Sequence, residues 1–358
     1  MIGTTSNVQA STRKHRSKRV GARLGAVALA LALIASACGD DSQGDDWFAS
    51  QASSGDKVTI GFTPPTLTMA DFYINMARGF MAEAAALGMD VEMLVKSPTT
   101  HAAAEEQLSI VESYINQGVD YLWISPVAFE AGEPMMAAAN DAGIPVLTGP
   151  FMDKYEGVDV LAYVGFSEFD AGAMQAQFAI DEFGDQLKVA IIQGAPGAFS
   201  DHRVNGIKSV LEQHSGVEIV AEPIANWDRQ QALEAVETII QAHPDLDVVF
   251  PVAGDMGLGS VEGLKTSGAL HNPTEVVGFD SLGQEANSIA RGEEYASIFN
   301  NPMGIGALAA QIVKTHMSGG TPQSDRLVSL IPITVDNVMS ELPGWFRGET
   351  EPDYFPEY

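Results

Sequence analysis

The chain has 358 residues, of which 46% are hydrophobic, and this length and composition fit two domains with sizeable cores. Its 19 basic and 47 acidic residues give a net charge of −28, which argues against a nucleic-acid partner because phosphate backbones are bound by Lys and Arg. The single cysteine excludes a disulfide framework and a cysteine-based zinc site.

Residues 1–37 have the composition of an export signal. Six Lys and Arg residues, with no acid among them, precede an apolar stretch at 24–35. That stretch is shorter than the roughly 20 apolar residues that a membrane-spanning helix needs. Ala35-Ser36-Ala37 then precede Cys38, which resembles a bacterial lipoprotein signal with cleavage before Cys38 and a lipid on its sulfur. Ordinary cleavage after Ala37 is the alternative. We expect lipidation, because the only cysteine stands where such a signal needs one.

Residues 38–57 are acidic and rich in Gly and Ser, and we expect a solvated tether there. From Val58 on, short apolar runs alternate with amphipathic stretches. The pattern predicts strands at 58–63, 91–95, 121–125 and 145–148 and helices at 71–87, 102–117 and 130–142. This alternation predicts a parallel sheet with helices on both faces.

The ends of these strands are informative because ligand sites form at the carboxyl ends of parallel strands. Phe72 and Tyr73 follow the first strand, and Ser125 ends the third. Gly149-Pro150 ends the fourth strand without a side chain that can hydrogen-bond. Trp123 lies inside the third strand, and we expect it in the core.

The second half repeats the pattern. It predicts strands at 160–166, 188–193, 217–224, 248–252, 276–279, 295–299 and 328–335, and helices at 171–183, 229–242, 282–290 and 302–318, with another starting at about 201. Trp227, Asp255, Asp280 and Asn300 follow strands, and Arg203 stands at a helix start. The glycine-rich run at 257–263 lies inside a predicted helix late in the chain, where a dinucleotide-binding loop does not belong.

The stretch from Val276 to Asp280, followed about twenty residues later by a strand ending Asn300-Asn301-Pro302, resembles the type I periplasmic solute-binding proteins. The ribose- and galactose-binding proteins of ABC importers are the nearest group. The resemblance implies an α/β fold with two doubly wound parallel-sheet lobes joined by a three-strand hinge. The implied parts are a first lobe at 58–166 plus 301–327, a second lobe at 167–300 plus 328–338, and an aromatic, acidic tail at 339–358.

The resemblance also implies a set of ligand-binding residues, with aromatic side chains stacking on the ligand and polar ones bonding to it. These are Phe72, Tyr73, Ser125, Arg203, Trp227, Asp255, Asp280 and Asn300. The planar fork of Arg203 suits two vicinal hydroxyls or a carboxylate. A surface arginine at a helix start is the alternative for Arg203, and a helix cap is the alternative for Asp255.

The chain departs from the family pattern at three strand ends. Gly149-Pro150 stands where an Asp-Arg-like pair is usual, and Ser125 and Ala253 each stand where the family has Asn. A ring sugar carries hydroxyls around its whole rim, and each one buried without a partner costs about 1–3 kcal/mol. The departures therefore predict weak or no binding of ribose, glucose and galactose. They favour a ligand that is polar on one side, such as a short polyol or a deoxysugar.

The expected function is capture of a small polar, sugar-like solute between the lobes and its delivery to an ABC permease and ATPase complex. We expect a monomeric lipoprotein on the outer face of the membrane. No G-x-S-x-G, H-E-x-x-H or P-loop motif occurs, so we expect no enzyme, no cofactor and no metal. A ligand-sensing partner of a membrane receptor kinase is the alternative. A carbohydrate hydrolase that uses Asp255 and Asp280 as paired carboxylates is a further one.

Overall fold

The computed structural model describes residues 57–67, 71–100 and 103–342. The expected export signal, Cys38, nearly all of the expected tether and residues 343–358 lie outside the described residues. The strands form two six-stranded sheets, each covered by helices. The predicted α/β fold with two largely parallel sheets is therefore confirmed.

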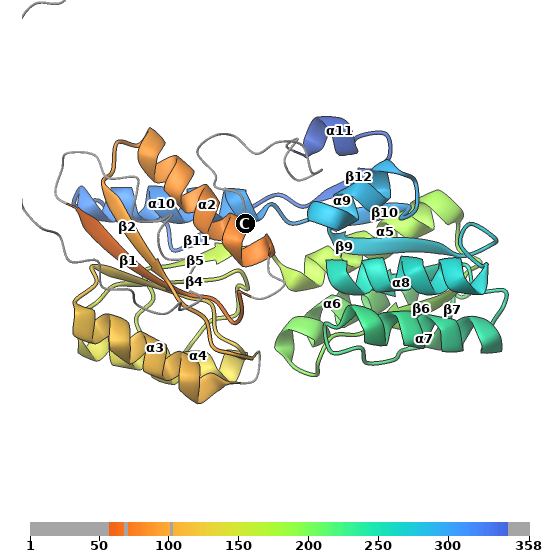
Figure 1. Cartoon of the computed structure of the whole chain (residues 1–358), viewed down its shortest axis with the longest axis horizontal. Coiled ribbons are helices and arrows are strands. Elements are labelled where there is room, and N and C mark those ends of the chain that lie inside the picture. Colours follow the sequence, from red (N-terminus) through yellow and green to blue (C-terminus); the bar gives the residue numbers. More distant parts are fainter. Residues whose placement is uncertain (1–56, 68–70, 101–102, 343–358) are drawn as a thin grey trace, which may run out of the picture. The chain divides into compact units, whose positions relative to one another are not determined.

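The first lobe is built on a sheet with strand order β11-β5-β4-β3-β1-β2, in which all pairings are parallel. Its strands are β1 (Val58–Thr63), β2 (Val91–Val95), β3 (Tyr121–Ile124), β4 (Val146–Thr148), β5 (Ala162–Gly165) and β11 (Asp325–Leu327). Its helices are α2 (Asp71–Ala86), α3 (Ala104–Gln117), α4 (Phe129–Asp141) and α10 (Pro302–Met317). Figure 1 shows α2 and α10 on one face of this sheet and α3 and α4 on the other.

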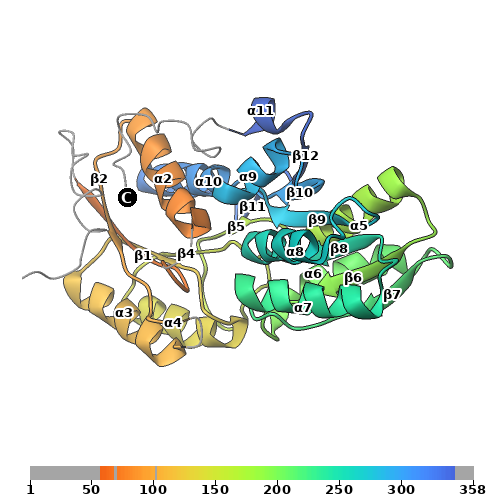
Figure 2. The same ribbon diagram turned by 45° about the vertical axis from the view of Figure 1, so that its right-hand side comes forward.

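The second lobe has the strand order β12-β10-β9-β8-β6-β7. Its strands are β6 (Lys188–Ile192), β7 (Glu218–Ala221), β8 (Val248–Pro251), β9 (Glu275–Asp280), β10 (Ala296–Phe299) and β12 (Ile331–Thr334), which runs antiparallel to β10. Its helices are α5 (Glu168–Phe183), α6 (Ala198–Leu211), α7 (Arg229–Ala242), α8 (Gly254–Ser267), α9 (Gly283–Ala290) and α11 (Val338–Glu341). Figure 2 shows α7 and α8 side by side over one face of the sheet.

The chain passes between the two sheets three times. It does so between β5 and α5, between β10 and α10, and between β11 and β12. In chain order, α10 and β11 of the first lobe therefore come after five of the six strands of the second sheet. These connections are the three crossings that the sequence predicts.

Helices α5 and α6 pack against each other at two glycines. A Cβ on Gly172 would lie 2.0 Å from the carbonyl oxygen of Arg203, and a Cβ on Gly206 would lie 2.1 Å from that of Phe169. No side chain fits at either contact, so the two helix backbones touch directly. This close approach fixes the height of Arg203 relative to the first turn of α5.

The hydrophobic core lies on both faces of each sheet. Trp123 is fully buried and stacks on Phe62 at 4.5 Å, as expected for a core residue. Leu342, in the part of the chain expected to form a tail, is also buried and packs in a cluster with Leu282 and Ile289 of the second lobe. Within the described residues, no helix has both the length and the apolar character needed to cross a bilayer.

Candidate functional site

The predicted site residues lie at or just after the carboxyl ends of strands. Phe72 and Tyr73 stand in the first turn of α2, Ser125 directly follows β3, Asp280 ends β9, and Asn300 directly follows β10. In a parallel sheet these ends share one edge, so residues distant in sequence can meet there.

Tyr73 marks the place where residues of the two lobes come together. Its phenol lies beside Ser125 of its own lobe and within electrostatic reach of Arg203, Glu168 and Asp280 of the second lobe. Burial raises the pKa of the Tyr73 phenol above its ordinary value, and the two carboxylates add to the rise while Arg203 opposes it. The structure thus brings four of the predicted residues into one region.

Arg203 is held by an ion pair that the sequence did not predict. Its Nε donates to Oε2 of Glu168 at 2.5 Å and its Nη2 donates to Oε1 at 3.2 Å. A third bond runs from Nη1 to the carbonyl oxygen of Val252 at 2.6 Å. The side chains of Arg203 and Glu168 are only 12% and 4% exposed. Arg203 is therefore a buried, oriented side chain.

The prediction that Arg203 stands at a helix start was wrong. Helix α6 begins at Ala198, so Arg203 lies in its second turn, and the surface-arginine alternative fails with it. The guanidinium also lies over aromatic rings, 4.1 Å from the centroid of Phe279 and 5.8 Å from that of Trp227. These contacts account for a buried cation near the helix N-terminus.

Glu168 was missed because its helix was predicted to begin at 171. The hydroxyl of Ser167 accepts a hydrogen bond from the backbone N–H of Asp170 at 3.1 Å and caps α5, which places Glu168 in the first turn. The pattern Ser-x-x-Asp at 167–170 is a helix-start signal that could have revealed this position. Burial raises the pKa of the Glu168 carboxyl, and Arg203 opposes this rise. Because both carboxylate oxygens accept N–H bonds, we expect Glu168 to be ionised at neutral pH.

Asp280 is held by two neutral donors. Its Oδ1 accepts from Nδ2 of Asn300 at 2.7 Å, and its Oδ2 accepts from the backbone N–H of Gly254 at 3.0 Å. Gly254 is the first residue of α8, and a helix N-terminus stabilises a negative charge. Asp280 therefore joins the ends of β9, β10 and α8 at one point.

Two buried polar atoms at these strand ends have no hydrogen-bond partner among the described residues. They are Oγ of Ser281, directly after β9, and Oδ1 of Asn300, directly after β10, both in the second lobe. Buried polar atoms in folded proteins are nearly always hydrogen-bonded, and leaving one without a partner costs about 1–3 kcal/mol. A bound solute with hydroxyl groups could supply both partners.

The backbone is strained at the same strand ends. Five of the six non-glycine residues with positive φ in the described part of the chain lie there: Asn226 (52°), Trp227 (64°), Asp280 (96°), Ser281 (60°) and Asn301 (44°). Such conformations cost on the order of 1–3 kcal/mol each and concentrate at ligand sites. They cluster at the carboxyl edge of the second sheet, next to Asp280 and Trp227.

Trp227 lies over a glycine that the sequence analysis did not single out. A Cβ on Gly194 would lie 2.3 Å from the indole ring, so only glycine leaves room for the ring in this position. Trp227 is partly buried against the core of the second lobe and within 5.8 Å of the Arg203 guanidinium. It thus forms an aromatic wall beside Arg203.

A cavity of about 370 Å³ extends from this region and is lined by residues of both lobes. Phe72 contributes from the first lobe, and Asp255, Asp280, Glu285 and Arg229 contribute from the second. Asp255 stands in the first turn of α8, whose N-cap position is Ala253, and lines the cavity. Arg229 is paired with Glu262 at 2.5 Å and bonded to Gln284 at 3.0 Å.

At the fourth strand end of the first lobe, the backbone of Pro150 is already hydrogen-bonded within the protein. Its carbonyl oxygen accepts from the N–H of Phe166 at 3.0 Å. A Cβ on Gly149 would lie 1.9 Å from the carbonyl oxygen of Val164, so this turn is pressed against the end of β5. The structure therefore gives this strand end no polar side chain, as the sequence indicates.

The lobes also touch each other beyond the predicted residues. Phe151 of the first lobe packs on Phe199 of α6 with ring centroids 4.4 Å apart. His202 Nδ1 lies 3.3 Å from Oδ2 of Asp153, which is an ion pair when the histidine is protonated. We call these two pairs the rim contacts.

Two buried glutamates lie behind Asp280, in the second lobe. Oε1 of Glu285 accepts from the Ser297 hydroxyl at 2.8 Å, and a Cβ on Gly278 would lie 2.9 Å from this Oε1 and 1.9 Å from Oε1 of Glu294. Burial is the main cause that raises the pKa of Glu285 to about 8. Burial and the neighbouring Glu285 raise the pKa of Glu294 well above its ordinary value. No group of three or more His, Cys, Asp or Glu in the described residues could hold a metal ion.

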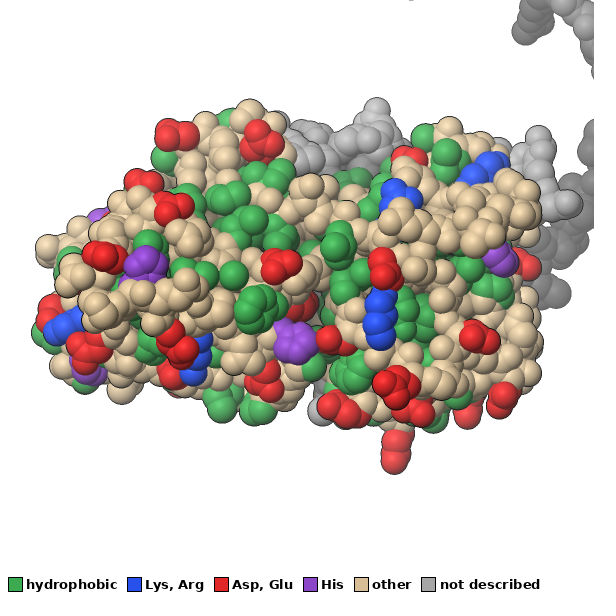
Figure 3. Space-filling model, turned by 180° about the vertical axis from the view of Figure 1, so that it is seen from behind, with side chains coloured by type: hydrophobic (Ala, Val, Ile, Leu, Met, Phe, Trp, Pro, Cys, Tyr) green, Lys and Arg blue, Asp and Glu red, His purple; other side chains and the backbone are tan. Residues whose placement is uncertain are grey.

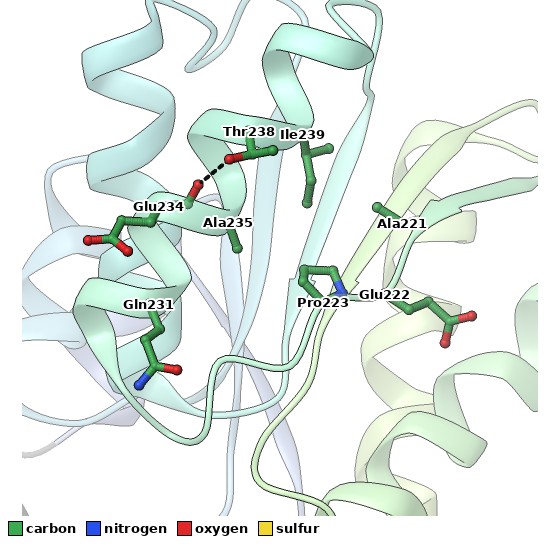
Figure 4. A pocket seen from close by; sticks show the side chains of 8 residues that line it. All are labelled: Ala221, Glu222, Pro223, Gln231, Glu234, Ala235, Thr238 and Ile239. Atoms are coloured by element: carbon green, nitrogen blue, oxygen red, sulfur yellow. Dashed lines mark hydrogen bonds between the residues drawn. The ribbon is translucent and has the colours of Figure 1, made fainter.

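A second groove, of about 470 Å³, lies at the outer edge of the second sheet, where β7 faces α7. Figure 4 shows its lining, with the carboxylates of Glu222 and Glu234 turned away from each other. None of the predicted site residues lines it.

Carboxylates are scattered over the face in Figure 3 and form no single acidic patch there.

Comparisons with known proteins agree with this geometry. Residues 60–321 match the periplasmic binding protein domain family. A ribose import binding protein of Bacillus subtilis is 31% identical over 275 residues, which cover 76% of this chain and 86% of that protein. A xylitol-binding protein of Mycolicibacterium smegmatis is 28% identical over 324 residues, which cover 90% of this chain and 87% of that protein.

A solved structure gives the same fold. A periplasmic solute-binding protein of an ABC transporter from Actinobacillus succinogenes, with bound D-allose, matches with a TM-score of 0.73 at 23% identity. The match covers 79% of this chain and 99% of that chain. At this identity the likeness bears on the fold alone.

Proposed function

The chain belongs to the periplasmic binding protein domain family, and from this premise we propose that it captures a sugar or a sugar-like polyol between its two lobes. The proposed site consists of Phe72, Tyr73, Ser125, Arg203, Trp227, Asp255, Asp280 and Asn300. Delivery of the solute to an ABC permease and ATPase complex follows from the same proposal.

The observation that carries this proposal is the meeting of the two lobes around Tyr73. Ser125 from one lobe and Arg203 and Asp280 from the other lie around one phenol. Aromatic rings offer a solute an apolar surface, while the polar groups bond its hydroxyls at the edges. A solute bound here would touch both lobes, and a bridging ligand favours closure about a hinge.

A short polyol is the solute class that we favour. The second lobe supplies Arg203, Asp280 and Asn300, whereas the first lobe supplies Ser125 and aromatic rings. This one-sided arrangement suits a solute whose hydroxyls need not be bonded around a full ring. The likeness to a xylitol-binding protein, which spans 90% of the chain, supports the same choice.

Binding without turnover is part of the proposal. A glycosidase needs two carboxyl groups on either side of one bond, one of them free to donate a proton. Asp280 accepts hydrogen bonds from Asn300 and Gly254 through its two oxygens, which fixes it as an acceptor. We also propose that the protein works outside the cytoplasm, as a monomer anchored by a lipid on Cys38.

A thermal-shift screen of polyols and sugars tests the function. A solute at 100 times its dissociation constant should add about 2.7 kcal/mol to the unfolding free energy. Xylitol, ribitol, myo-inositol and the common hexoses form the first panel. Trp227→Ala should lose the response, whereas Trp123, which lies in the core, is unsuitable for such a test. Stabilisation that persists in Trp227→Ala would place the solute elsewhere, and no response to any polyol or sugar would refute the proposal.

A further inference from the structure

We propose that Glu168 sets the chemical class of the solute: by neutralising Arg203 it makes the site accept uncharged solutes and reject carboxylates such as sugar acids. This inference rests on the proposed function and narrows it. The sequence left open whether the fork of Arg203 bonds two hydroxyls or a carboxylate. The structure favours the hydroxyls.

The first argument is the geometry of the guanidinium. A guanidinium has five N–H bonds. Two of those of Arg203 point to Glu168 and a third points to Val252. The fork formed by Nε and Nη2 is therefore already occupied by a carboxylate. The two remaining N–H bonds, one on Nη1 and one on Nη2, can each donate to a solute hydroxyl, and a solute carboxylate could reach them only end-on, where the net charge of the site decides.

The second argument is charge. A solute beside Arg203 also lies near Glu168, which is bonded to Arg203, and near Asp280, which follows the Phe279 ring that Arg203 covers at 4.1 Å. Arg203 and Glu168 cancel, and Asp280 is bonded to neutral donors only, Asn300 and the backbone of Gly254. The group as a whole is negative. An anionic solute would meet net repulsion in a region where burial weakens screening by water and salt.

The third argument is that the pair is built into the fold. Glu168 stands in the first turn of α5, where a helix N-terminus favours a negative charge. The glycine contacts at Gly172 and Gly206 fix α5 against α6 and so hold the two side chains opposite each other. A solute acid could displace Glu168 only by leaving this carboxylate buried and unpaired.

The test compares uncharged solutes with the matching acids. Xylitol with xylonate, sorbitol with gluconate and ribitol with ribonate differ mainly in one carboxylate. Binding is measured by calorimetry and thermal shift, with sodium chloride at equal ionic strength as the reference for each acid. Glu168→Gln keeps the size of the side chain and an acceptor oxygen but removes its charge.

The expected result is a change in selectivity. The wild type should bind none of the acids. Glu168→Gln should bind at least one of them, with an affinity at least about tenfold above the wild-type limit of detection. Glu222→Gln, which removes the partner of Lys208 at 2.5 Å on the outer edge of the lobe, should behave as the wild type.

A double variant separates charge from shape and keeps the test decisive if Glu168→Gln is unstable. Glu168→Gln with Arg203→Gln has two neutral amides in place of the ion pair and should gain no acid. Binding of any acid by the wild type overturns the inference. So does a Glu168→Gln protein that folds and gains none. If the wild type binds no uncharged solute, the proposed function fails, while the acid response of Glu168→Gln still decides the role of Glu168.

Discussion

The two buried glutamates behind Asp280 should make the stability of the protein depend on pH in an unusual direction. A glutamate in an unfolded chain has a pKa of about 4.3. In the folded protein burial raises the pKa of Glu285 to about 8 and that of Glu294 well above its ordinary value. Between these limits the folded protein binds more protons than the unfolded chain. The free energy of unfolding must therefore fall as the pH rises through this window.

The size of the effect follows from the shift. One pKa unit corresponds to about 1.36 kcal/mol, so the Glu285 carboxyl alone gives a loss on the order of 4 kcal/mol between pH 5 and pH 8. Glu294→Gln removes one of the two titrating groups and replaces it with an amide that can donate to Glu285. The difference in unfolding free energy between the variant and the wild type should therefore shift in favour of the variant by a few kcal/mol from pH 5 to pH 8.

Urea unfolding followed by circular dichroism at pH 5, 6, 7 and 8 measures the dependence. Glu234→Gln, which removes an exposed carboxylate of α7, is the matched control and should keep the wild-type slope. If the unfolding free energy of Glu294→Gln falls with pH as steeply as that of the wild type, then Glu294 does not stay protonated in the folded protein, and the prediction is refuted.

Three further predictions concern the site and the anchor. Trp227→Ala should weaken solute binding at least tenfold, about 1.4 kcal/mol by calorimetry, while the exposed control Arg291→Ala should bind normally. Arg203→Ala should also weaken binding. It should also destabilise the fold, because a buried Glu168 without its partner costs about 3–5 kcal/mol in chemical unfolding. Calorimetry should find weak or no binding of ribose, glucose and galactose, and submicromolar affinity for any of them would contradict the one-sided site. Cys38→Ser should move the protein from the membrane to the soluble fraction on cell fractionation, since each buried methylene of a lipid contributes about 0.8 kcal/mol, and unchanged partitioning would exclude the lipid.

The predicted fold class is confirmed because it depends on local periodicity, and the predicted family, which rested on the residues at 276–280 and 300–302, is confirmed as well. Apolar runs of strand length alternate with amphipathic stretches, and this rhythm survives errors at the ends of elements. Helices α5 and α6 begin at Glu168 and Ala198, three residues before their expected starts, and strand β11 was not predicted. The missed first turns, Glu168-Phe169-Asp170 and Ala198-Phe199-Ser200, mix polar and apolar residues, so the periodicity of apolar residues does not locate their starts.

The site could be predicted only as far as residues stand at strand ends. Position alone made Asp280 a candidate, and the family resemblance supplied Tyr73 and Ser125. Neither source could show that Glu168 forms an ion pair with Arg203. The two residues lie 35 positions apart in the sequence and meet because helices α5 and α6 pack together at glycines. Glu294 was overlooked for a related reason. A glutamate usually faces water, and here Gly278 leaves the space that lets it stay inside.

The rim contacts separate two properties that are usually altered together. Phe151 with Phe199, and Asp153 with His202, join the lobes without any atom of the solute. A solute that needs the closed form binds with an apparent affinity scaled by the fraction of molecules already closed. Strengthening or weakening the rim multiplies the affinities for all solutes by one common factor. Binding strength could therefore be adjusted at the rim, and discrimination between solutes at the strand ends, without either change disturbing the other.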